Sequence, residues 1–415
     1  MLRALYASIS GLRAHQTMMD VTANNIANVN TQGFKAGRAI FADALSQTVR
    51  GGGIPTDATG STNPMQIGLG TRVAAVTTSF TQGALQLTGG VSDLAIQGDG
   101  FFVVQRGGAQ LLTRDGSFNW DSAGQLVTAG GARVLGWQAD PTTGKINSSS
   151  PPGFISVPTG VLPPSATSDV VIGGNMSAGT AVGDFVETSG TVHDSIGTAY
   201  NLTMKMTKTA TGSWTAAITA TDPQGVVKDL TPATPPVLTF DSTGHLTSSP
   251  TIALTGVALG SGAPQNITLE LGNTQHSLTQ FDQVGTLSMP VKDGSAGAEL
   301  SNVSFGTDGS VTAQYTNGDS TVIAKVALAQ VTNPEGLVKA ADNLYETTLT
   351  SGDPVFGEAG TGSFGQVAPG ALEGSNVDLA AEFTNLVLAQ RGFQANTRVI
   401  TTSDEMLSDL VNVKR

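Results

Sequence analysis

Histidine and cysteine are the side chains that most often bind metals or serve as nucleophile and base. The chain has no cysteine, which excludes disulfides, Cys-ligated zinc and thiol catalysis. Its 4 histidines lie far apart in sequence and match no metal-binding spacing: His15, His193, His245 and His276. We therefore interpret them as solvated or locally hydrogen-bonded, and we expect no metal site.

Residues 360–365, Gly-Thr-Gly-Ser-Phe-Gly, match the G-x-G-x-x-G pattern of dinucleotide-binding loops. Such a loop opens a helix, whereas the next residues, Gln-Val-Ala-Pro, have no helical periodicity, and a chain with 52 glycines gives chance matches. P-loop, nucleophile-elbow and EF-hand spacings do not occur in the sequence. The scattered acidic residues neither support nor exclude a glycosidase-like carboxylate pair. We expect no cofactor and no enzymatic activity.

The charge balance is acidic, with 20 basic and 32 acidic residues and a net charge of −12. Without a basic cluster, this balance disfavours nucleic acid and anionic membranes as partners. Arg3 and Arg13 interrupt the apolar residues of the first 20 positions, so we predict neither a cleaved signal peptide nor membrane insertion.

The most unusual polar motif lies in residues 23–35, where asparagines alternate with apolar Ile26 and Val29 before Gly33 and Phe34. Asparagine and glycine favour helix ends, so the motif is typical of a helix C-terminus. The apolar residues must bury one face while the amides remain on the other, which indicates a contact partner. The asparagines are Asn24, Asn25, Asn28 and Asn30.

Apolar residues before this motif recur at spacings of three and four, which predicts an amphipathic helix with a heptad pattern. The sevenfold series is Leu5, Leu12, Met19 and Ile26, and Leu2, Ile9, Gln16 and Ala23 fall between its members.

A second heptad pattern runs through residues 379–411. Its sevenfold series is apolar throughout: Leu379, Leu386, Phe393, Ile400 and Leu407. The alternate positions include Gln390, Thr397 and Asp404, which narrow the apolar stripe. Ser375 is the predicted N-cap, with Asp378 at the third helical position.

The simplest arrangement pairs the two heptad segments, so that both chain ends form one coiled-coil domain. The alternative is two independent amphipathic helices that lie on the β body. Between them, short alternating runs predict a β-rich body. Residues 111–137 are predicted to form a meander with turns at Asp115-Gly116, 122–124 and 130–131, and residues 303–331 one with turns at Asp308-Gly309 and Asn317-Gly318.

Residues 146–285 are richer in Thr, Ser and Pro, which predicts a separate β domain inserted into another. The expected fold is mixed: a terminal α-helical coiled-coil domain formed by both chain ends, plus two mainly-β domains nested in sequence. The predicted boundaries are 1–35 and 371–415 for the axial terminal helices, 36–145 and 286–370 for a split β domain with its connecting segment, and 146–285 for the inserted outer domain.

Three stretches carry a family resemblance: DVTANNIANVNTQGFK (20–35), VSDLAIQGDGFFVV (91–104) and residues 370–412. With these motifs in this order, the chain resembles the axial rod and hook proteins of the bacterial flagellum. The inserted segment matches more loosely, but its presence implies a hook subunit, because the family's distal rod protein lacks it. The glycine-rich run 46–73 resembles the distal rod instead, which stays the alternative.

The resemblance implies a structural subunit, exported by the flagellar type III apparatus without a cleaved signal, that polymerises into a curved, torque-transmitting tube outside the cell. Its implied partners are other copies of itself, the hook cap, and the distal rod and hook-filament junction proteins. The competing class is a β-rich binding or hydrolytic domain with helical dimerisation ends. The expected subunit-interaction residues are Leu5, Ile9, Leu12, Met19, Asn24, Asn25, Ile26, Asn28, Gly33, Phe34, Leu379, Leu386, Phe393, Ile400 and Leu407.

Overall fold

The computed structural model describes residues 2–53, 60, 61, 63–140, 143–158, 160–260, 262–272 and 277–412, without the side chains of Leu2, Leu410 and Val411. The chain divides into two compact units. The first comprises Met1–Val157, Val303–Ala313 and Thr321–Arg415, and the second comprises Pro158–Asn302 and Gln314–Ser320.

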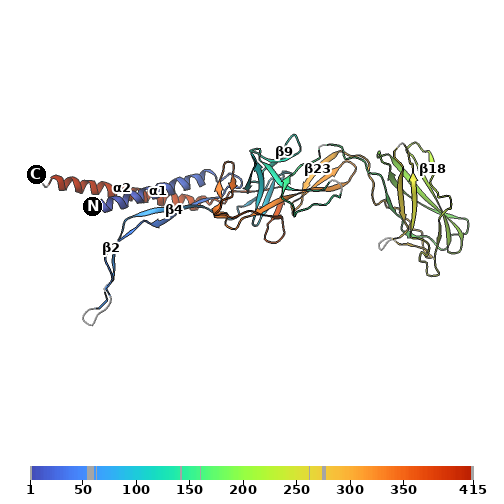
Figure 1. The fold of residues 1–415 in the computed structure, drawn as a ribbon, viewed down its shortest axis with the longest axis horizontal. Helices are drawn as coiled ribbons and strands as arrows, with labels where there is room; N and C mark the ends of the chain where they lie inside the picture. The colour runs from blue at the N-terminus through green and yellow to red at the C-terminus, as the bar shows by residue number, and fades with distance from the viewer. Residues whose placement is uncertain are drawn as a thin grey trace. The chain divides into compact units, whose positions relative to one another are not determined.

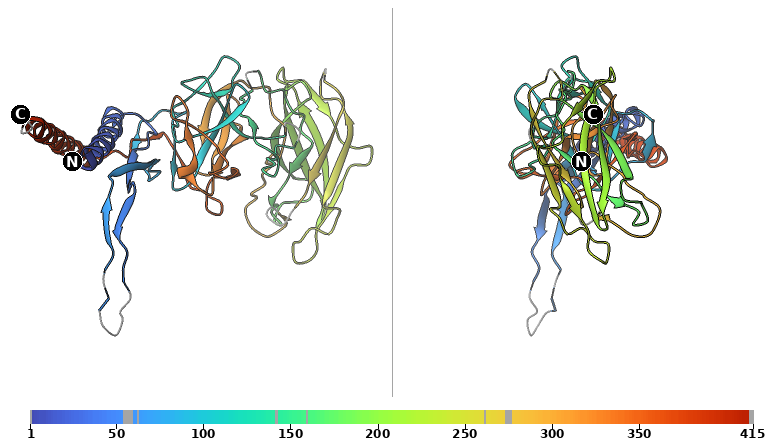
Figure 2. Two further views of the ribbon diagram at one scale, coloured as in Figure 1. Left: turned by 60° about the vertical axis from the view of Figure 1, so that its left-hand side comes forward. Right: turned by 90° about the vertical axis from the view of Figure 1, so that its right-hand side faces the viewer.

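The helices of the first unit are α1 (Leu2–Ala27) and α2 (Leu379–Asn412), as the heptad patterns predict. They lie side by side in both views, blue and red in Figures 1 and 2. At the end of α1, the carbonyl oxygen of Asn24 accepts two hydrogen bonds from Asn28: from its side-chain nitrogen at 2.9 Å and from its backbone N–H at 3.2 Å.

The predicted N-cap of the second helix is wrong. Asp378, not Ser375, caps α2, because its carboxylate accepts hydrogen bonds from the backbone N–H groups of Ala380 and Ala381 at 2.8 and 3.2 Å. Ser375 instead accepts from the N–H of Val377 at 3.3 Å, before the helix begins.

Small antiparallel pairs follow α1 and precede α2. They are β1 (Gly37–Asp43) with β4 (Thr71–Thr78), β2 (Ser46–Arg50) with β3 (Met65–Gly68), β5 (Leu85–Leu87) with β30 (Ala371–Glu373), and β6 (Leu94–Gln97) with β29 (Gln366–Pro369). The β2–β3 hairpin is exposed along both strands. Part of the predicted glycine-rich segment, residues 54–59 and 62, lies outside the described residues.

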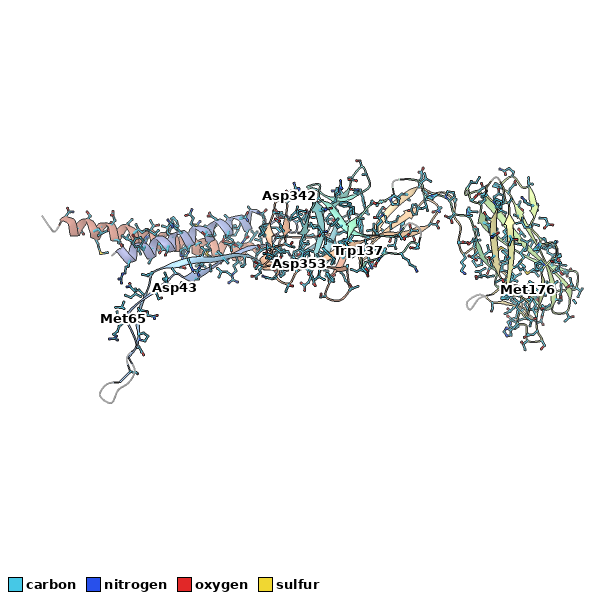
Figure 3. All side chains as sticks on the ribbon, viewed as in Figure 1. Asp43, Met65, Trp137, Met176, Asp342 and Asp353 are labelled. Atoms are coloured by element: carbon cyan, nitrogen blue, oxygen red, sulfur yellow. The ribbon has the colours of Figure 1, made fainter. Side chains whose placement is uncertain are left out.

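A large antiparallel sheet has the strand order β23-β24-β25-β11-β7-β8-β27-β26, with β9, β10, β12 and β28 attached. Its strands are β7 (Phe101–Arg106), β8 (Ala109–Thr113), β9 (Phe118–Trp120), β10 (Leu126–Thr128), β11 (Arg133–Gln138), β12 (Gly153–Phe154), β23 (Leu300–Phe305), β24 (Ser310–Tyr315), β25 (Ser320–Gln330), β26 (Val338–Lys339), β27 (Leu344–Glu346) and β28 (Val355–Glu358). A 3-10 turn, η1, spans Pro334–Gly336. Trp137, labelled in Figure 3, lies in an apolar cluster of the first unit with Phe101 and Tyr345.

The predicted meander over 111–137 is confirmed for β9, β10 and β11, which pair consecutively, and the hairpin order of β23, β24 and β25 is confirmed as well. The predicted meander is wrong at its first turn, Asp115-Gly116, because β8 pairs with β7 and β27 instead of β9. The chain at Gly116 passes so close to Leu94 that a Cβ there would lie 1.6 Å from the Leu94 carbonyl oxygen.

The second unit is all β in its described part, with sheets β15-β16-β17-β18 plus β19, β13-β21-β20, and β14-β22. Every second residue of β16 and β17 is buried, including Leu202, Met204 and Trp214, so the sheet covers a core that also holds Met176 (Figure 3). The strands are β13 (Asp169–Val171), β14 (Gly174–Asn175), β15 (Phe185–His193), β16 (Ala199–Ala210), β17 (Ser213–Thr221), β18 (Val227–Asp229), β19 (Val237–Thr239), β20 (Thr251–Val257), β21 (Gln265–Glu270) and β22 (Leu278–Thr279).

Candidate functional site

The candidate site is the pair of terminal helices together with the residues that anchor it to the β part of the same unit. The helices run antiparallel in one constant register. Gly11 lies opposite Asn396: a Cβ atom at Gly11 would be 2.9 Å from the side-chain nitrogen of Asn396. Gly392 lies opposite His15: a Cβ atom at Gly392 would be 2.5 Å from the imidazole ring of His15. Asn25 extends the same register by donating to the Glu382 carboxylate at 3.1 Å.

The side chains that are buried along these helices are small or polar. This corrects the predicted seam, in which the large apolar residues of the two sevenfold series would lie between the helices. They are Ser8, Ala14, Thr22 and Asn25 in α1, and Ala389 and Ser403 in α2. In α1, Ser8 and Thr22 lie three residues after members of the predicted sevenfold series, whereas Ala14 lies two residues after Leu12 and Asn25 one residue before Ile26. Small side chains allow the two backbones to approach closely, whereas leucines at the same positions would hold them apart.

The predicted seam residues lie at the flanks or on the outside of the pair. Leu5, Leu12, Met19 and Ile26 are half-buried, and so are Leu386, Phe393, Ile400 and Leu407. Ile9 and Leu379 are exposed, with 39% and 41% of their surface accessible. The structure therefore brings none of these large apolar side chains into full burial.

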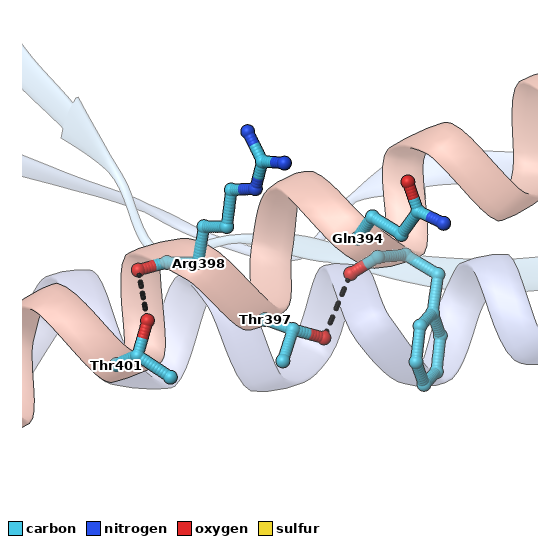
Figure 4. A pocket seen from close by; sticks show the side chains of 5 residues that line it. Gln394, Thr397, Arg398 and Thr401 are labelled. Carbon is cyan, nitrogen blue, oxygen red and sulfur yellow. Dashed lines mark hydrogen bonds between the residues drawn. The ribbon is translucent and has the colours of Figure 1, made fainter.

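The outer face of α2 carries exposed apolar side chains. Phe383 and Leu388 are 53% and 57% exposed on it. Thr397 and Thr401 are exposed, and they donate their hydroxyls to the carbonyl oxygens of Phe393 and Arg398 at 2.9 Å (Figure 4). Phe393, Gln394, Thr397, Arg398 and Thr401 line a shallow depression of about 320 Å³ there.

The asparagine motif joins α1 to the strand that follows it. Asn25 is buried and makes two bonds to Gly37: its amide nitrogen donates to the Gly37 carbonyl oxygen at 2.8 Å, and its amide oxygen accepts from the Gly37 N–H at 2.9 Å. Asn24 is exposed, and Asn28 is half-buried and accepts from the Thr31 hydroxyl at 3.0 Å. The amides of Asn25 and Asn28 thus satisfy groups of their own chain.

Gly33 and Phe34 are buried at the next turn. Gly33 has φ +67°, and a Cβ there would lie 2.6 Å from the backbone nitrogen of Asp115, so only glycine fits without strain. Its N–H donates to the carbonyl oxygen of Glu373 at 2.8 Å. The Lys339 ammonium lies 4.7 Å from the centre of the Phe34 ring and donates to the Lys35 carbonyl oxygen at 2.9 Å.

A buried ionic cluster holds the two chain ends together, and sequence reasoning missed it. Lys35 and Glu373 form an ion pair at 2.6 Å with both side chains 0% exposed, and Arg114, 4% exposed, binds the other carboxylate oxygen at 3.2 Å. The Gly83 N–H adds a bond to Glu373 at 2.8 Å. Lys35 donates to the Thr81 carbonyl oxygen at 2.7 Å, and Arg114 to that of Gly98 at 3.0 Å.

This environment shifts the titration of two groups. Burial lowers the pKa of the Lys35 ammonium, and its hydrogen bond to Glu373 opposes part of that effect. Burial raises the pKa of the Tyr345 phenol, and the nearby Glu373 carboxylate adds to the rise. Glu373 is thus the counter-ion of two enclosed cations, which makes it the central residue of the anchor.

Asn376 completes the anchor between Glu373 and the start of α2. Its side-chain oxygen accepts from the Ala36 N–H at 2.8 Å, and its nitrogen donates to the carbonyl oxygen of Ser79 at 2.9 Å. The segments that enter and leave the helix pair are therefore tied to each other. The sequence offered one signal for this cluster: Lys35 and Glu373 stand beside apolar residues inside two of the family motifs.

The described residues contain no group of three or more His, Asp or Glu side chains placed to hold a metal ion. No helix in the described part is long and apolar enough to span a membrane.

Four families match consecutive parts of the chain. Residues 5–35 match the flagella basal body rod protein family, 95–177 the flagellar hook protein FlgE/F/G D1 domain, 184–295 the flagellar basal body protein FlaE D2 domain, and 368–413 the C-terminal family of flagellar basal body rod FlgEFG proteins.

Relatives match over the full length. Flagellar hook protein FlgE of Borreliella burgdorferi is 37% identical, with 100% of each chain covered. FlgE of Treponema pallidum is 35% identical, again over 100% of each chain, and FlgE of Escherichia coli is 32% identical over 99% of this chain and 100% of that one.

A solved structure is similar in fold. The crystal structure of Helicobacter pylori flagellar hook protein FlgE2 superposes with a TM-score of 0.55 at 15% identity, and it covers 68% of this chain and 98% of that one.

Proposed function

Because the chain belongs to the flagellar hook protein family, we propose that its terminal helices polymerise it into a curved, flexible tube that passes motor torque to the filament. It is a structural subunit of the bacterial flagellar hook and serves motility. The full-length matches are to hook proteins, which favours this function over the distal rod alternative.

One observation carries the proposal: the helix pair buries its small residues inside and keeps its large apolar residues outside. Tyr6 and Ile9 of α1 and Phe383, Val387 and Leu388 of α2 are all exposed in the single chain. Burial of such a side chain is worth roughly 1.5 to 3 kcal/mol, so contact between helix pairs of neighbouring copies would be strongly favourable.

We propose that the paired ends act as a short coiled coil whose outer surface meets other subunits. The half-buried and exposed members of the predicted set make those contacts: Leu5, Ile9, Leu12, Met19, Asn24, Ile26, Asn28, Leu379, Leu386, Phe393, Ile400 and Leu407. Asn25, Gly33 and Phe34 support them from within the chain, because all three are buried there.

The remaining expectations, which come from the sequence patterns and from the family, are proposals as well. They comprise the division into axial helices, a split β domain and an inserted outer domain, and export by the flagellar type III apparatus to the cell exterior without a cleaved signal. They also comprise contacts with the hook cap, the distal rod and the hook-filament junction proteins. The proposed role is mechanical, so no catalysis is part of it.

The test is assembly of purified protein, followed by electron microscopy and sedimentation. Changing Leu386→Ser together with Phe393→Ser should abolish tubes, since two large contact residues of α2 are lost. The matched control replaces two exposed valines of the second unit, Val226→Ser with Val227→Ser, and should still form tubes. Normal assembly of the α2 double variant would contradict the proposal, and straight, rigid wild-type tubes would favour the rod.

A further inference from the structure

The end of α2 has no partner in α1. Because Asn396 lies opposite Gly11, the start of α1 at Leu2 lies opposite Glu405, and residues 406–412 extend past it. Figures 1 and 2 show this overhang of the red helix beyond the blue one. Met406 is exposed there, and Leu407 is half-buried.

The overhang has a defined distribution of charge. With about 100° of rotation per residue, Asp404 and Asp409 flank the strip that carries Met406 and Leu407, while Glu405 lies on the opposite side. All three acidic side chains are exposed and take part in no ion pair among the described residues. The next charged residues, Lys414 and Arg415, lie outside the described residues.

A groove of about 390 Å³ between α1 and β4 has the complementary character. Tyr6, Ile9 and Val73 give it apolar walls, and Arg13 and Arg72 stand at it as exposed cations. Neither arginine has an ion-pair partner in the described part of the chain. The Thr71 N–H donates to the Ser10 hydroxyl oxygen at 3.2 Å, which fixes β4 against α1.

We propose that this groove receives the overhanging end of α2, residues 406–412, from a second copy of the chain. Met406 and Leu407 fill the apolar part, and Asp404 and Asp409 pair with Arg13 and Arg72. The inference rests on the proposed function, since it names the contact by which the helix pairs polymerise. Each copy offers one overhang and one groove on different surfaces, so the contact is head-to-tail, and it builds an open helical assembly when the rotation between copies does not close a ring.

The overhang of the same copy does not reach the groove. Ile9 lies opposite residue 398 in the common register, so Leu407 is nine residues further along α2, or about 13 Å at 1.5 Å per residue. A disulfide needs Cα atoms within about 7 Å. A bond between positions 9 and 407 therefore identifies contact between two copies, and the absence of natural cysteine makes the assay free of background.

The first test mixes full-length Ile9→Cys and Leu407→Cys proteins under assembly conditions and oxidises them. We expect disulfide-linked dimers that contain one copy of each, about tenfold more than with Glu405→Cys in place of Leu407→Cys, because Glu405 faces away from the groove. Equal yields with both partners would overturn the proposal. If the wild type forms no tubes, the proposed function fails, while this yield still decides the docking in concentrated solution.

The second test exchanges the charges. Arg13→Glu with Arg72→Glu, and separately Asp404→Arg with Asp409→Arg, should each raise the critical concentration for assembly about tenfold at low salt, because like charges then meet. Combining all four changes should restore it to within about threefold, and the difference should shrink near 1 M salt, where the Debye length is about 3 Å. The control Glu405→Arg should change it by less than about twofold. A fourfold variant as defective as either half would overturn the docking.

Discussion

Replacing Glu373 by Gln should strongly destabilise the first compact unit and leave the second unaffected. The carboxylate accepts from Lys35 at 2.6 Å, from the Gly83 N–H at 2.8 Å and from Arg114 at 3.2 Å. The amide that Glu373→Gln introduces would keep the shape of the carboxylate but lose its charge. Its NH₂ group would take the place of a carboxylate oxygen and would therefore face a hydrogen-bond donor instead of an acceptor. Two cations with side chains 0% and 4% exposed then remain without a counter-ion.

Breaking a buried ion pair from one side costs about 3 to 5 kcal/mol. The bonds of Lys35 to Thr81 and of Arg114 to Gly98 survive and hold the loss toward the lower end of that range. With a urea m-value of about 3 kcal/mol per molar, the unfolding midpoint of this unit should fall by about 1 to 1.5 M. Adding Lys35→Met to Glu373→Gln should recover part of the loss, because one uncompensated cation disappears.

The assay is pulsed amide exchange with mass spectrometry across a urea series. The amide protection of β7 reports the unfolding of the first unit, and that of β16 reports the unfolding of the second. The matched control is Asp342→Asn, which breaks the ion pair with Arg106 at 2.7 Å, where the side chains are 53% and 47% exposed. An exposed pair is worth about 0 to 1 kcal/mol, so the midpoint should fall by no more than about 0.3 M. Equal shifts for Glu373→Gln and Asp342→Asn, or an equal shift in both units, would refute the reasoning.

Three further outcomes are expected. Gly116→Ala should destabilise the first unit by about 3 kcal/mol or more, because its Cβ would lie 1.6 Å from the Leu94 carbonyl oxygen, while Gly153→Ala, with open space around it, should be near neutral in urea unfolding. The hydrogen bond from Lys325 lowers the pKa of Glu358, so that pair should stabilise the unit above about pH 4.5 and lose its effect as the pH falls through the lowered pKa. When unfolding midpoints are measured over a pH series, Lys325→Met should flatten the series in this pH range. A series that Lys325→Met leaves unchanged would contradict this prediction. Leu386→Ser with Phe393→Ser should leave the melting temperature of both β parts within about 2 °C of the wild type while assembly is lost, and a lowered melting temperature of the β parts would show that these side chains stabilise the monomer instead.

The helices and several hairpins could be predicted because their signals are local. Heptad spacing gave both helices, and Asn317-Gly318 marked its hairpin correctly. The same heptad pattern misplaced the seam, because it marks side chains that need burial without naming the surface that buries them. The actual contact uses Ser8, Gly11 and Ala14, which are too small or too polar to give an apolar periodicity.

The anchor could not be predicted, because its members are distant in sequence and ordinary in type. Lys35 follows a turn, and Arg114 stands beside a glycine turn that reads as a hairpin. The apolar neighbours of Lys35 and Glu373 indicate burial of each residue, but nothing near Lys35 or Arg114 indicates that both bind the Glu373 carboxylate away from solvent. The N-cap was predicted wrongly for a related reason. Ser375 and Asp378 are both favourable N-cap residues, and which of them caps α2 depends on the residue at which the helix begins after β30.

The pairing of the two chain ends has a consequence for the order in which the protein folds. The Lys35–Glu373 contact joins residues 338 positions apart, and β5 and β6 find their partners only in β30 and β29. Closing so long a loop is slow, whereas the second unit is built almost entirely from one continuous stretch and can fold as soon as that stretch is free. A chain that emerges with its N-terminus first would therefore complete its second unit early. Its helix pair would form last, after residue 412 has emerged.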